Sequence, residues 1–287
     1  MDEQLCMLGF GLALSEKVEK AIATFQHYEA EALRRDPVNG YYVCDSFGKD
    51  SCVIRHLAKA SGVKHQCHHN LTTIDPPELI YFGRDNHQDT IVHRPDIPML
   101  VKLLDKSNGP PTRLSRWCCE IYKEGAGNDK IKVFGVRAAE SARRKARWKV
   151  WTPWRPNANP SVVDSWVLNP ILYWTDEDLW KYIRQENIPY CCLYDEGFQR
   201  LGCVGCPMSC RRHQDFVRWP GYERAWKRAF EKFWNKWHGV PRRDGKARWF
   251  DIERPSGITF TCWQDLWQWW MEELPEPDDD DCQMGLF

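Results

Sequence analysis

The sequence predicts an α/β protein with a doubly wound, mainly parallel sheet and a helical C-terminal region. In the first 105 residues, short apolar runs alternate with helical segments, which is the pattern of strand–helix–strand units. Beyond Cys210, apolar and aromatic residues recur at helical spacing to about Trp237. In such sheets ligands bind beyond the carboxyl ends of the strands, so we expect the site in the loops that follow them.

The first predicted elements are a helix, a strand and a second helix. Residues 15–35 place apolar side chains at helical spacing among charges and predict an amphipathic helix. Residues 41–44 form a short apolar strand, and residues 45–50 form a polar loop. The next helix is expected from Ser51 to about residue 61, because Gly62 then ends it.

The later elements follow from the same signals. They are a strand at residues 63–69, a short helix after Pro76 and Pro77, a brief helix at residues 99–105, a strand at residues 131–136, a basic loop at residues 137–147, a turn-rich segment at residues 157–161, a helix capped by Thr175 with Asp176, Glu177 and Asp178 in its first turn, and a short apolar helix at residues 262–274.

Charge is balanced over the whole chain but not locally. Lys and Arg together number 40, as do Asp and Glu, yet residues 200–249 contain thirteen basic and four acidic residues. A basic stretch rich in Trp could face nucleic acid. Amphipathic helices with aromatic core faces give the same pattern, and we favour this second interpretation.

The polar loop at residues 45–50 has the features of an anion site. Backbone amides at a helix N-terminus bind anions, Gly48 allows close approach to the backbone, and Lys49 adds a positive charge. A phosphate group fits such a loop. The spacing is not the G-x-x-x-x-G-K-[ST] pattern, because no glycine lies six residues before Lys49. A glycine turn that only caps a helix is the alternative.

Thirteen cysteines are many for a chain of this length, and their uneven placement indicates metal or redox chemistry. Cys203 and Cys206 form a C-x-x-C motif, which is typical of half a zinc site, a redox pair or half an iron-sulfur site. Adjacent Cys118 and Cys119 are the best partner pair, because the separated irons of a cubane can take neighbouring thiolates. We therefore predict an iron-sulfur cluster, with Cys118 or Cys210 as the fourth ligand; zinc and plain thiols remain alternatives.

Together these segments resemble the phosphoadenosine phosphosulfate (PAPS) reductase family of the adenine-nucleotide alpha-hydrolase superfamily, whose fold is PP-loop and HUP-like. The resemblance covers residues 40–207. It rests on the loop SFGKDS, RWCCEIYKE around the paired cysteines, GVRAAESARR from Gly135, NPILYWTDEDLWKYI from Asn169 and LYDEGFQRLGCVGCP from Leu193. The loop departs from the family's S-G-G-x-D-S only at Phe47, which replaces the first glycine.

The resemblance implies a set of site residues. The loop, namely Ser46, Phe47, Gly48, Lys49, Asp50 and Ser51, would hold the phosphates, and Tyr42 and Val43 would border the adenine. Arg137 and Arg143 would clamp the anion and Glu140 would order the arginines, since guanidinium groups suit phosphoryl oxygens. Lys49, Asp50, Arg137 and Arg143 are the expected catalytic residues, whereas Arg144, Lys145 and Arg147 are expected in a solvated loop. Cys118, Cys119, Cys203 and Cys206 would hold a [4Fe-4S] cluster.

Our first functional hypothesis is an iron-sulfur ATP pyrophosphatase. The resemblance implies ATP because sulfonucleotide reductases usually lack the Lys-Asp-Ser ending of this loop. ATP would be cleaved between its α and β phosphates, with Mg²⁺ present, to adenylate or sulfurate an acceptor. Enzymes of DNA phosphorothioation and tRNA thiolation are similar, so a nucleic-acid acceptor and a protein partner both agree with this hypothesis.

Two alternatives remain open. A PAPS or adenylyl-sulfate reductase would form sulfite, and such enzymes use a cysteine in a C-terminal E-C-G-[IL]-H motif. Cys282 lies in DDDDCQMGLF instead, where four aspartates would raise the pKa of the thiol and weaken it as a nucleophile. The other alternative is a non-catalytic nucleotide sensor or DNA-binding partner.

The expected organisation has four parts. They are an N-terminal helical segment (1–36), a PP-loop domain with the iron-sulfur cysteines (37–210), a basic, Trp-rich helical region (211–274) and an acidic tail (275–287). The chain has no apolar run of about 18 residues and no signal-peptide pattern. We therefore expect a soluble, cytoplasmic protein without a membrane partner.

Overall fold

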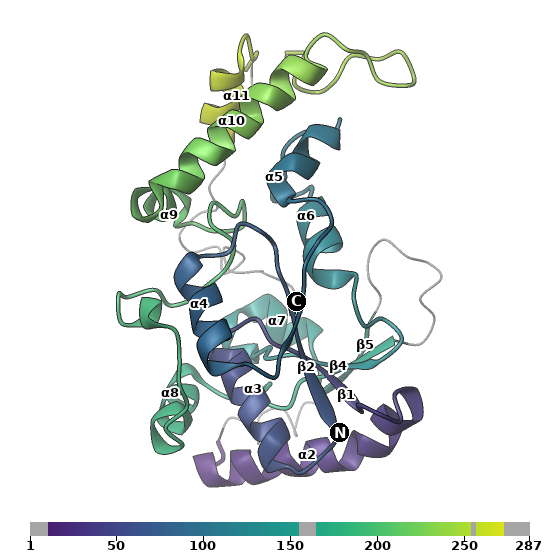
Figure 1. Ribbon diagram of the computed structural model, residues 1–287, viewed down its shortest axis with the longest axis vertical. Helices are drawn as coiled ribbons and strands as arrows, with labels where there is room; N and C mark the ends of the chain where they lie inside the picture. The colour runs from purple at the N-terminus through teal and green to yellow at the C-terminus, as the bar shows by residue number, and fades with distance from the viewer. Residues whose placement is uncertain (1–10, 155–164, 254–256, 273–287) are drawn as a thin grey trace.

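The computed structural model describes residues 11–154, 165–253 and 257–272, and its centre is a six-stranded sheet (Figure 1). The strand order is β3-β2-β1-β4-β6-β5, and all neighbours are parallel except β5 and β6. The strands are β1 (Tyr41–Cys44), β2 (His65–Asn70), β3 (Ile91–His93), β4 (Ile131–Val133), β5 (Trp151–Trp154) and β6 (Ser165–Leu168). The predicted doubly wound, mainly parallel α/β fold is confirmed.

Helices flank the sheet and form the C-terminal region. They are α2 (Leu14–Arg35), α3 (Lys49–Ala60), α4 (Pro77–Asn86), α5 (Met99–Lys102), α6 (Trp117–Cys119), α7 (Ala142–Arg147), α8 (Asp176–Gln185), α9 (Arg212–Arg218), α10 (Pro220–Trp237) and α11 (Trp263–Glu272). Short 3₁₀ turns occur at η1 (Leu103–Asp105), η3 (Ala138–Glu140) and η4 (Cys192–Tyr194), and a π turn at η2 (Glu120–Glu124). Among the described helices, none is long and apolar enough to cross a membrane.

The structure differs from the sequence prediction at several elements. Strands β3, β5 and β6 were not predicted: β3 is short and exposed, and Pro153 lies within the edge strand β5. The segment at residues 137–147 is not a loop, because it contains η3 and α7. Ser141 caps α7 by accepting a hydrogen bond from the amide of Arg144 at 3.1 Å. Helix α3 begins at Lys49, two residues before the expected start.

Two apolar clusters explain how the parts hold together. One packs α2, α3 and α8 against the sheet around Phe25, Val53 and Leu179. The other joins Phe47 to the aromatic faces of α10 and α11, including Trp226. Figure 1 shows α10 and α11 at the opposite end of the molecule from α2. The buried tryptophans of these helices confirm the packing interpretation of the Trp-rich region, and the second cluster continues across residue 210.

Candidate functional site

The loop between β1 and α3 is fixed by a buried carboxylate. Asp45 accepts hydrogen bonds from the amide of Phe47 at 3.0 Å, from His87 Nδ1 at 2.6 Å and from the Thr90 hydroxyl at 3.0 Å. Burial acts to raise the pKa of Asp45, but these donors and the charge of His87 outweigh it, so the pKa is lowered. Asp45 is therefore ionised and holds the turn that leads into α3.

Phe47, the residue that departs from the family pattern, has a left-handed backbone with φ of 61°. Glycine adopts this conformation readily, whereas a side chain makes it costly. The Phe47 ring is buried and stacks on His69, with centroids 4.0 Å apart. Gly83 also lies against the ring, since a Cβ added there would come within 2.3 Å of it. Core packing thus offsets the backbone cost.

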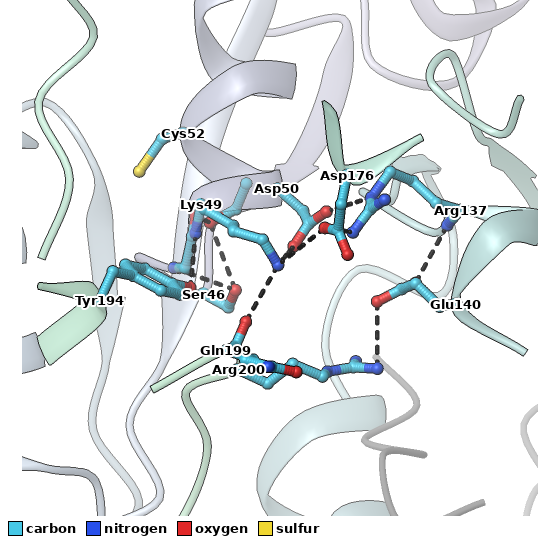
Figure 2. Close-up of polar contacts among 12 residues, drawn as sticks. Ser46, Lys49, Asp50, Cys52, Arg137, Glu140, Asp176, Tyr194, Gln199 and Arg200 are labelled. Atoms are coloured by element: carbon cyan, nitrogen blue, oxygen red, sulfur yellow. Dashed lines mark hydrogen bonds and ion pairs between the residues drawn. The ribbon is translucent and has the colours of Figure 1, made fainter. Parts of the chain in front are cut away.

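Side-chain hydroxyl oxygens accept hydrogen bonds from the backbone amides at the start of α3 (Figure 2). The amide of Gly48 donates to Ser46 Oγ at 3.4 Å, and the amide of Lys49 donates to the Tyr194 hydroxyl at 2.9 Å. Ser51 Oγ donates to the carbonyl of Gly48 at 2.8 Å. Phosphate oxygens accept from helix N-termini in the same way, so the geometry suits an anion that replaces these hydroxyls.

An ionic network lies beside the loop, as Figure 2 shows. Lys49 Nζ donates to the carbonyl of Gln199 at 3.0 Å and lies 3.7 Å from Asp50 and 3.5 Å from Asp176. Arg137, which is almost fully buried, contacts Asp50 at 2.6 Å and Asp176 at 2.8 Å. Burial acts to raise the pKa of Asp50, but Arg137 and Lys49 outweigh it and lower the pKa. Asp50 is therefore an anion between two cations.

Glu140 orders arginines, although not the pair expected from the sequence. Its carboxylate pairs with Arg144 and with Arg200 at 3.0 Å, and it accepts the backbone amide of Arg137 at 3.1 Å. The expectation of a solvated Arg144 is wrong, because its side chain is buried; burial and the nearby Arg200 lower its pKa to about 10. Arg143 is exposed, and its role as an anion clamp stays a prediction.

A cavity of about 480 Å³ links the loop to the C-x-x-C motif. Its lining includes Ser46, His69, Thr72, Cys203 and Cys206. The volume lies within the usual range for small-ligand sites, roughly 300–1,000 Å³. Gln199, which accepts from Lys49, and Arg200, which pairs with Glu140, also line this cavity, so an anion at the loop and a second group in the cavity can be bound side by side.

The C-x-x-C motif is held by contacts from two directions. The amide of Val204 donates to the carbonyl of Ile74 at 2.8 Å, and Trp226 of α10 donates to the carbonyl of Val204 at 3.1 Å. Gly205 has φ of 74°, and an added Cβ would come within 2.5 Å of Phe216. Helix α10 therefore fixes the position of Cys203 and Cys206 at the cavity wall.

The paired cysteines interact electrostatically with those of the C-x-x-C motif. A hydrogen bond to Cys119 and burial raise the pKa of Cys118, and the charges of Cys119, Cys206 and Cys203 add to the increase. The charges of Cys119, Cys203 and Cys206 therefore all act on Cys118. Cys210, by contrast, is exposed. Lys123 belongs to the same group, because the charges of Cys203, Cys119 and Cys206 raise its pKa against the effect of burial.

These cysteines suit a single metal ion and an iron-sulfur cluster to different degrees. Among the described residues, no three His, Cys, Asp or Glu side chains lie close enough to hold a single ion. A cubane cluster instead binds each thiolate through a different iron. Thiols that interact electrostatically with one another and with Lys123, and Arg116 3.6 Å from Cys119 Sγ, form a donor set whose chemistry suits such an anionic cluster.

The structure adds site residues that sequence reasoning missed. Asp176 was assigned to the helix dipole only, and Gln199, Arg200, Tyr194 and His69 carried no assigned role. All of these except His69 lie in segments that resemble the PAPS reductase family. That resemblance could have identified them from the sequence. Cys282, the acidic tail and residues 157–161 lie outside the described residues.

Comparison with known proteins gives the following relatives. Two uncharacterized proteins of Methanocaldococcus jannaschii are 30% and 27% identical over 48% and 80% of this chain, which spans 27% and 54% of their lengths. Adenosine 5'-phosphosulfate reductase of Bacillus thuringiensis is 26% identical over 63% of this chain and 79% of its own. The crystal structure of PAPS reductase from Candida auris is 17% identical, with a TM-score of 0.44 over 62% of this chain and 93% of that one.

A family model gives the decisive match. The model described as phosphoadenosine phosphosulfate reductase domain matches residues 41–209, which is more than half of the chain. The matched range contains the loop, the ionic network around Arg137 and the cysteines Cys118, Cys119, Cys203 and Cys206. The chain therefore belongs to the phosphoadenosine phosphosulfate reductase domain family.

Proposed function

We propose that this protein binds ATP at the loop of residues 46–51 and cleaves it between the α and β phosphates, passing the adenylyl group to an acceptor. The observation that carries the proposal is the contact of Lys49 and Arg137 with both Asp50 and Asp176 at the start of α3. Two cations and two carboxylates at one anion site are suited to a polyphosphate with its metal ion.

The chemistry follows from these four side chains. The acceptor's nucleophile forms a bond to the α-phosphorus, the bond to the bridging oxygen of the β-phosphate breaks, and pyrophosphate leaves. Lys49 and Arg137 stabilise the negative charge that grows on the phosphate oxygens. Asp50 and Asp176 would hold Mg²⁺, which commonly takes one or two carboxylates together with substrate phosphates. Mg²⁺ would neutralise phosphate charge when bound.

The proposal is tested by product analysis. Protein purified without oxygen is incubated with Mg²⁺ and ATP, adenylyl sulfate or PAPS, and pyrophosphate and sulfite are measured. Pyrophosphate from ATP supports the proposal. Sulfite from a sulfonucleotide, with no pyrophosphate from ATP, contradicts it. Nucleotide binding without either product would favour a sensor instead.

A reductase is the second candidate, and a specific observation favours it. Several curated relatives are named adenosine 5'-phosphosulfate reductase, and one of them is 43% identical to this chain over 93 residues. A reductase would need a thiol to attack the sulfur, release AMP and later give sulfite and a disulfide. The four cysteines near the cavity are compatible with this chemistry, so the sulfite assay decides between the candidates.

We further propose that Cys118, Cys119, Cys203 and Cys206 hold a [4Fe-4S] cluster. Anaerobically purified protein should then be brown and contain about four iron and four sulfide per chain. The Cys118→Ser variant is expected to lose most of the iron, because Cys118 shares the neighbourhood of the other three thiols. Cys210→Ser is the matched control and should keep the iron. Colourless wild-type protein, or loss of iron only in Cys210→Ser, would contradict the assignment.

The acceptor, we propose, is a nucleic acid that contacts α10. Arg224, Arg228 and Lys232 are exposed at intervals of four residues, on the side opposite the buried Trp226 and Phe230. Among the described residues, none forms an ion pair with any of these three cations. The following loop adds the exposed Arg242, Arg243 and Lys246. A row of cations of this kind binds phosphate backbones with little sequence preference.

Neutralising this row should weaken nucleic-acid binding and its salt dependence. Changing Arg224, Arg228 and Lys232 to Gln is expected to reduce the slope of log affinity against log salt by about two to three units. A fluorescently labelled single strand and duplex serve as probes. The control triple variant, Lys20→Gln with Arg34→Gln and Lys59→Gln, lies on α2 and α3 and should keep the wild-type slope. Equal slopes in both triple variants would refute the assignment.

A further inference from the structure

His69 lies at the carboxyl-terminal part of β2 with one ring nitrogen bonded and the other free of a partner. Its side chain is buried, with 4% of the residue exposed. Nδ1 lies 2.8 Å from the carbonyl oxygen of Asp45. A carbonyl can only accept, so Nδ1 carries the proton and Nε2 presents a lone pair. Within the described part of the chain, Nε2 has no hydrogen-bond partner.

The His69 side chain belongs to the wall of the cavity. His69 lines the cavity together with Ser46 of the loop and Cys203 of the C-x-x-C motif. The imidazole cannot easily turn away, because its ring stacks on Phe47 and its Nδ1 is fixed to the loop backbone. An unpaired buried acceptor destabilises the folded protein unless a ligand donates a hydrogen bond to it. The cavity therefore favours a ligand that donates a proton at this point.

The charged groups around the ring keep it neutral. Burial lowers the pKa of His69, and Lys123 of η2 lowers it further. The carboxylates of Asp75 and Asp45, and the hydrogen bond to the Asp45 backbone, act in the opposite direction but are outweighed. At neutral pH the imidazole is thus unprotonated at Nε2 and can accept a proton.

We propose that His69 Nε2 is the general base that takes the proton from the acceptor's nucleophile as it attacks the nucleotide. This inference rests on the proposed adenylyl transfer. The nucleophile forms its bond to the α-phosphorus, its proton moves to Nε2, and the α–β phosphoanhydride bond breaks to release pyrophosphate. The proton then leaves His69 for solvent. No other reactant is required. Positioned bases of this kind typically contribute about 10²–10⁴ in rate.

The test uses a substitution that keeps the structural contact and removes the base. In His69→Asn the side-chain amide can still donate to the Asp45 carbonyl, but no nitrogen replaces Nε2. With water as the nucleophile, pyrophosphate release from saturating ATP is expected to fall about 10²-fold or more, with KM for ATP unchanged. The acid limb of the wild-type kcat–pH profile should disappear. In His69→Gly, added imidazole should restore part of the rate, which a merely structural role would not explain.

His65→Asn is the matched control. His65 lies on the same strand and its Nδ1 also contacts a backbone carbonyl, that of Val63 at 2.9 Å, but it does not line the cavity. This variant should keep the wild-type rate. A His69→Asn rate equal to wild type overturns the inference and leaves the proposed function intact. Absence of pyrophosphate from wild-type protein overturns both. A ¹⁵N spectrum that places the His69 proton on Nε2 overturns the inference alone.

Discussion

Lys49→Ala is expected to reduce pyrophosphate release from ATP by about 10²–10³-fold. The Lys49 ammonium group is held at the start of α3 by the Gln199 carbonyl at 3.0 Å and by Asp50 and Asp176. It therefore needs little rearrangement to meet a phosphate that binds at the same helix end. Its loss removes a fixed positive charge where negative charge grows during cleavage. The rate is measured at saturating ATP and Mg²⁺.

Lys59→Ala is the control for this prediction. Lys59 lies on the same helix but is exposed in its last turn. The variant should keep the wild-type rate, and both variants should unfold at similar denaturant concentrations if the effect of Lys49→Ala is catalytic. Unchanged turnover in Lys49→Ala would remove the loop from the active site.

Arg137→Leu is expected to lower the free energy of unfolding by about 3 kcal/mol at pH 7. Removal of one partner from a buried ion pair typically costs about 3–5 kcal/mol, because the other charge stays buried. The loss of the pair with Asp50 accounts for most of this cost, because the Asp176 side chain is largely exposed and screened by solvent. The lower end of the range therefore applies. Denaturant unfolding monitored by Trp fluorescence gives the measurement.

The effect of Arg137→Leu should depend on pH in a defined direction. The folded-state pKa of Asp50 is lowered, so the wild-type pair stabilises the protein above the unfolded pKa of about 4 and loses this contribution as pH falls through the folded pKa. The loss of unfolding free energy in Arg137→Leu should thus be full at pH 7 and shrink below about pH 4.

Arg147→Leu is the control. Arg147 is an exposed residue of α7, and its substitution should change the free energy of unfolding by less than about 0.5 kcal/mol. A deficit independent of pH would contradict this account.

Local signals were sufficient for the parts of the site that lie within one segment. An apolar strand, a polar loop and a helix between residues 41 and 61 follow from residue types alone, and the structure contains all three. The capping of α8 by Thr175 was equally predictable. The edge strands were not, because β3 is exposed and β5 contains a proline, so neither has the buried apolar pattern of a central strand.

The partners of the site residues could not be read from the sequence. Lys49 and Tyr194 are 145 positions apart, and Arg137 and Asp50 are 87 positions apart. Arg144 and Arg143 are neighbours in the sequence, yet the register of a short helix buries one against Glu140 and exposes the other. Residue types fixed which chemistry the chain can carry out. Only the tertiary structure decided which charges meet, since ion pairs and buried hydrogen bonds depend on packing between segments distant in sequence.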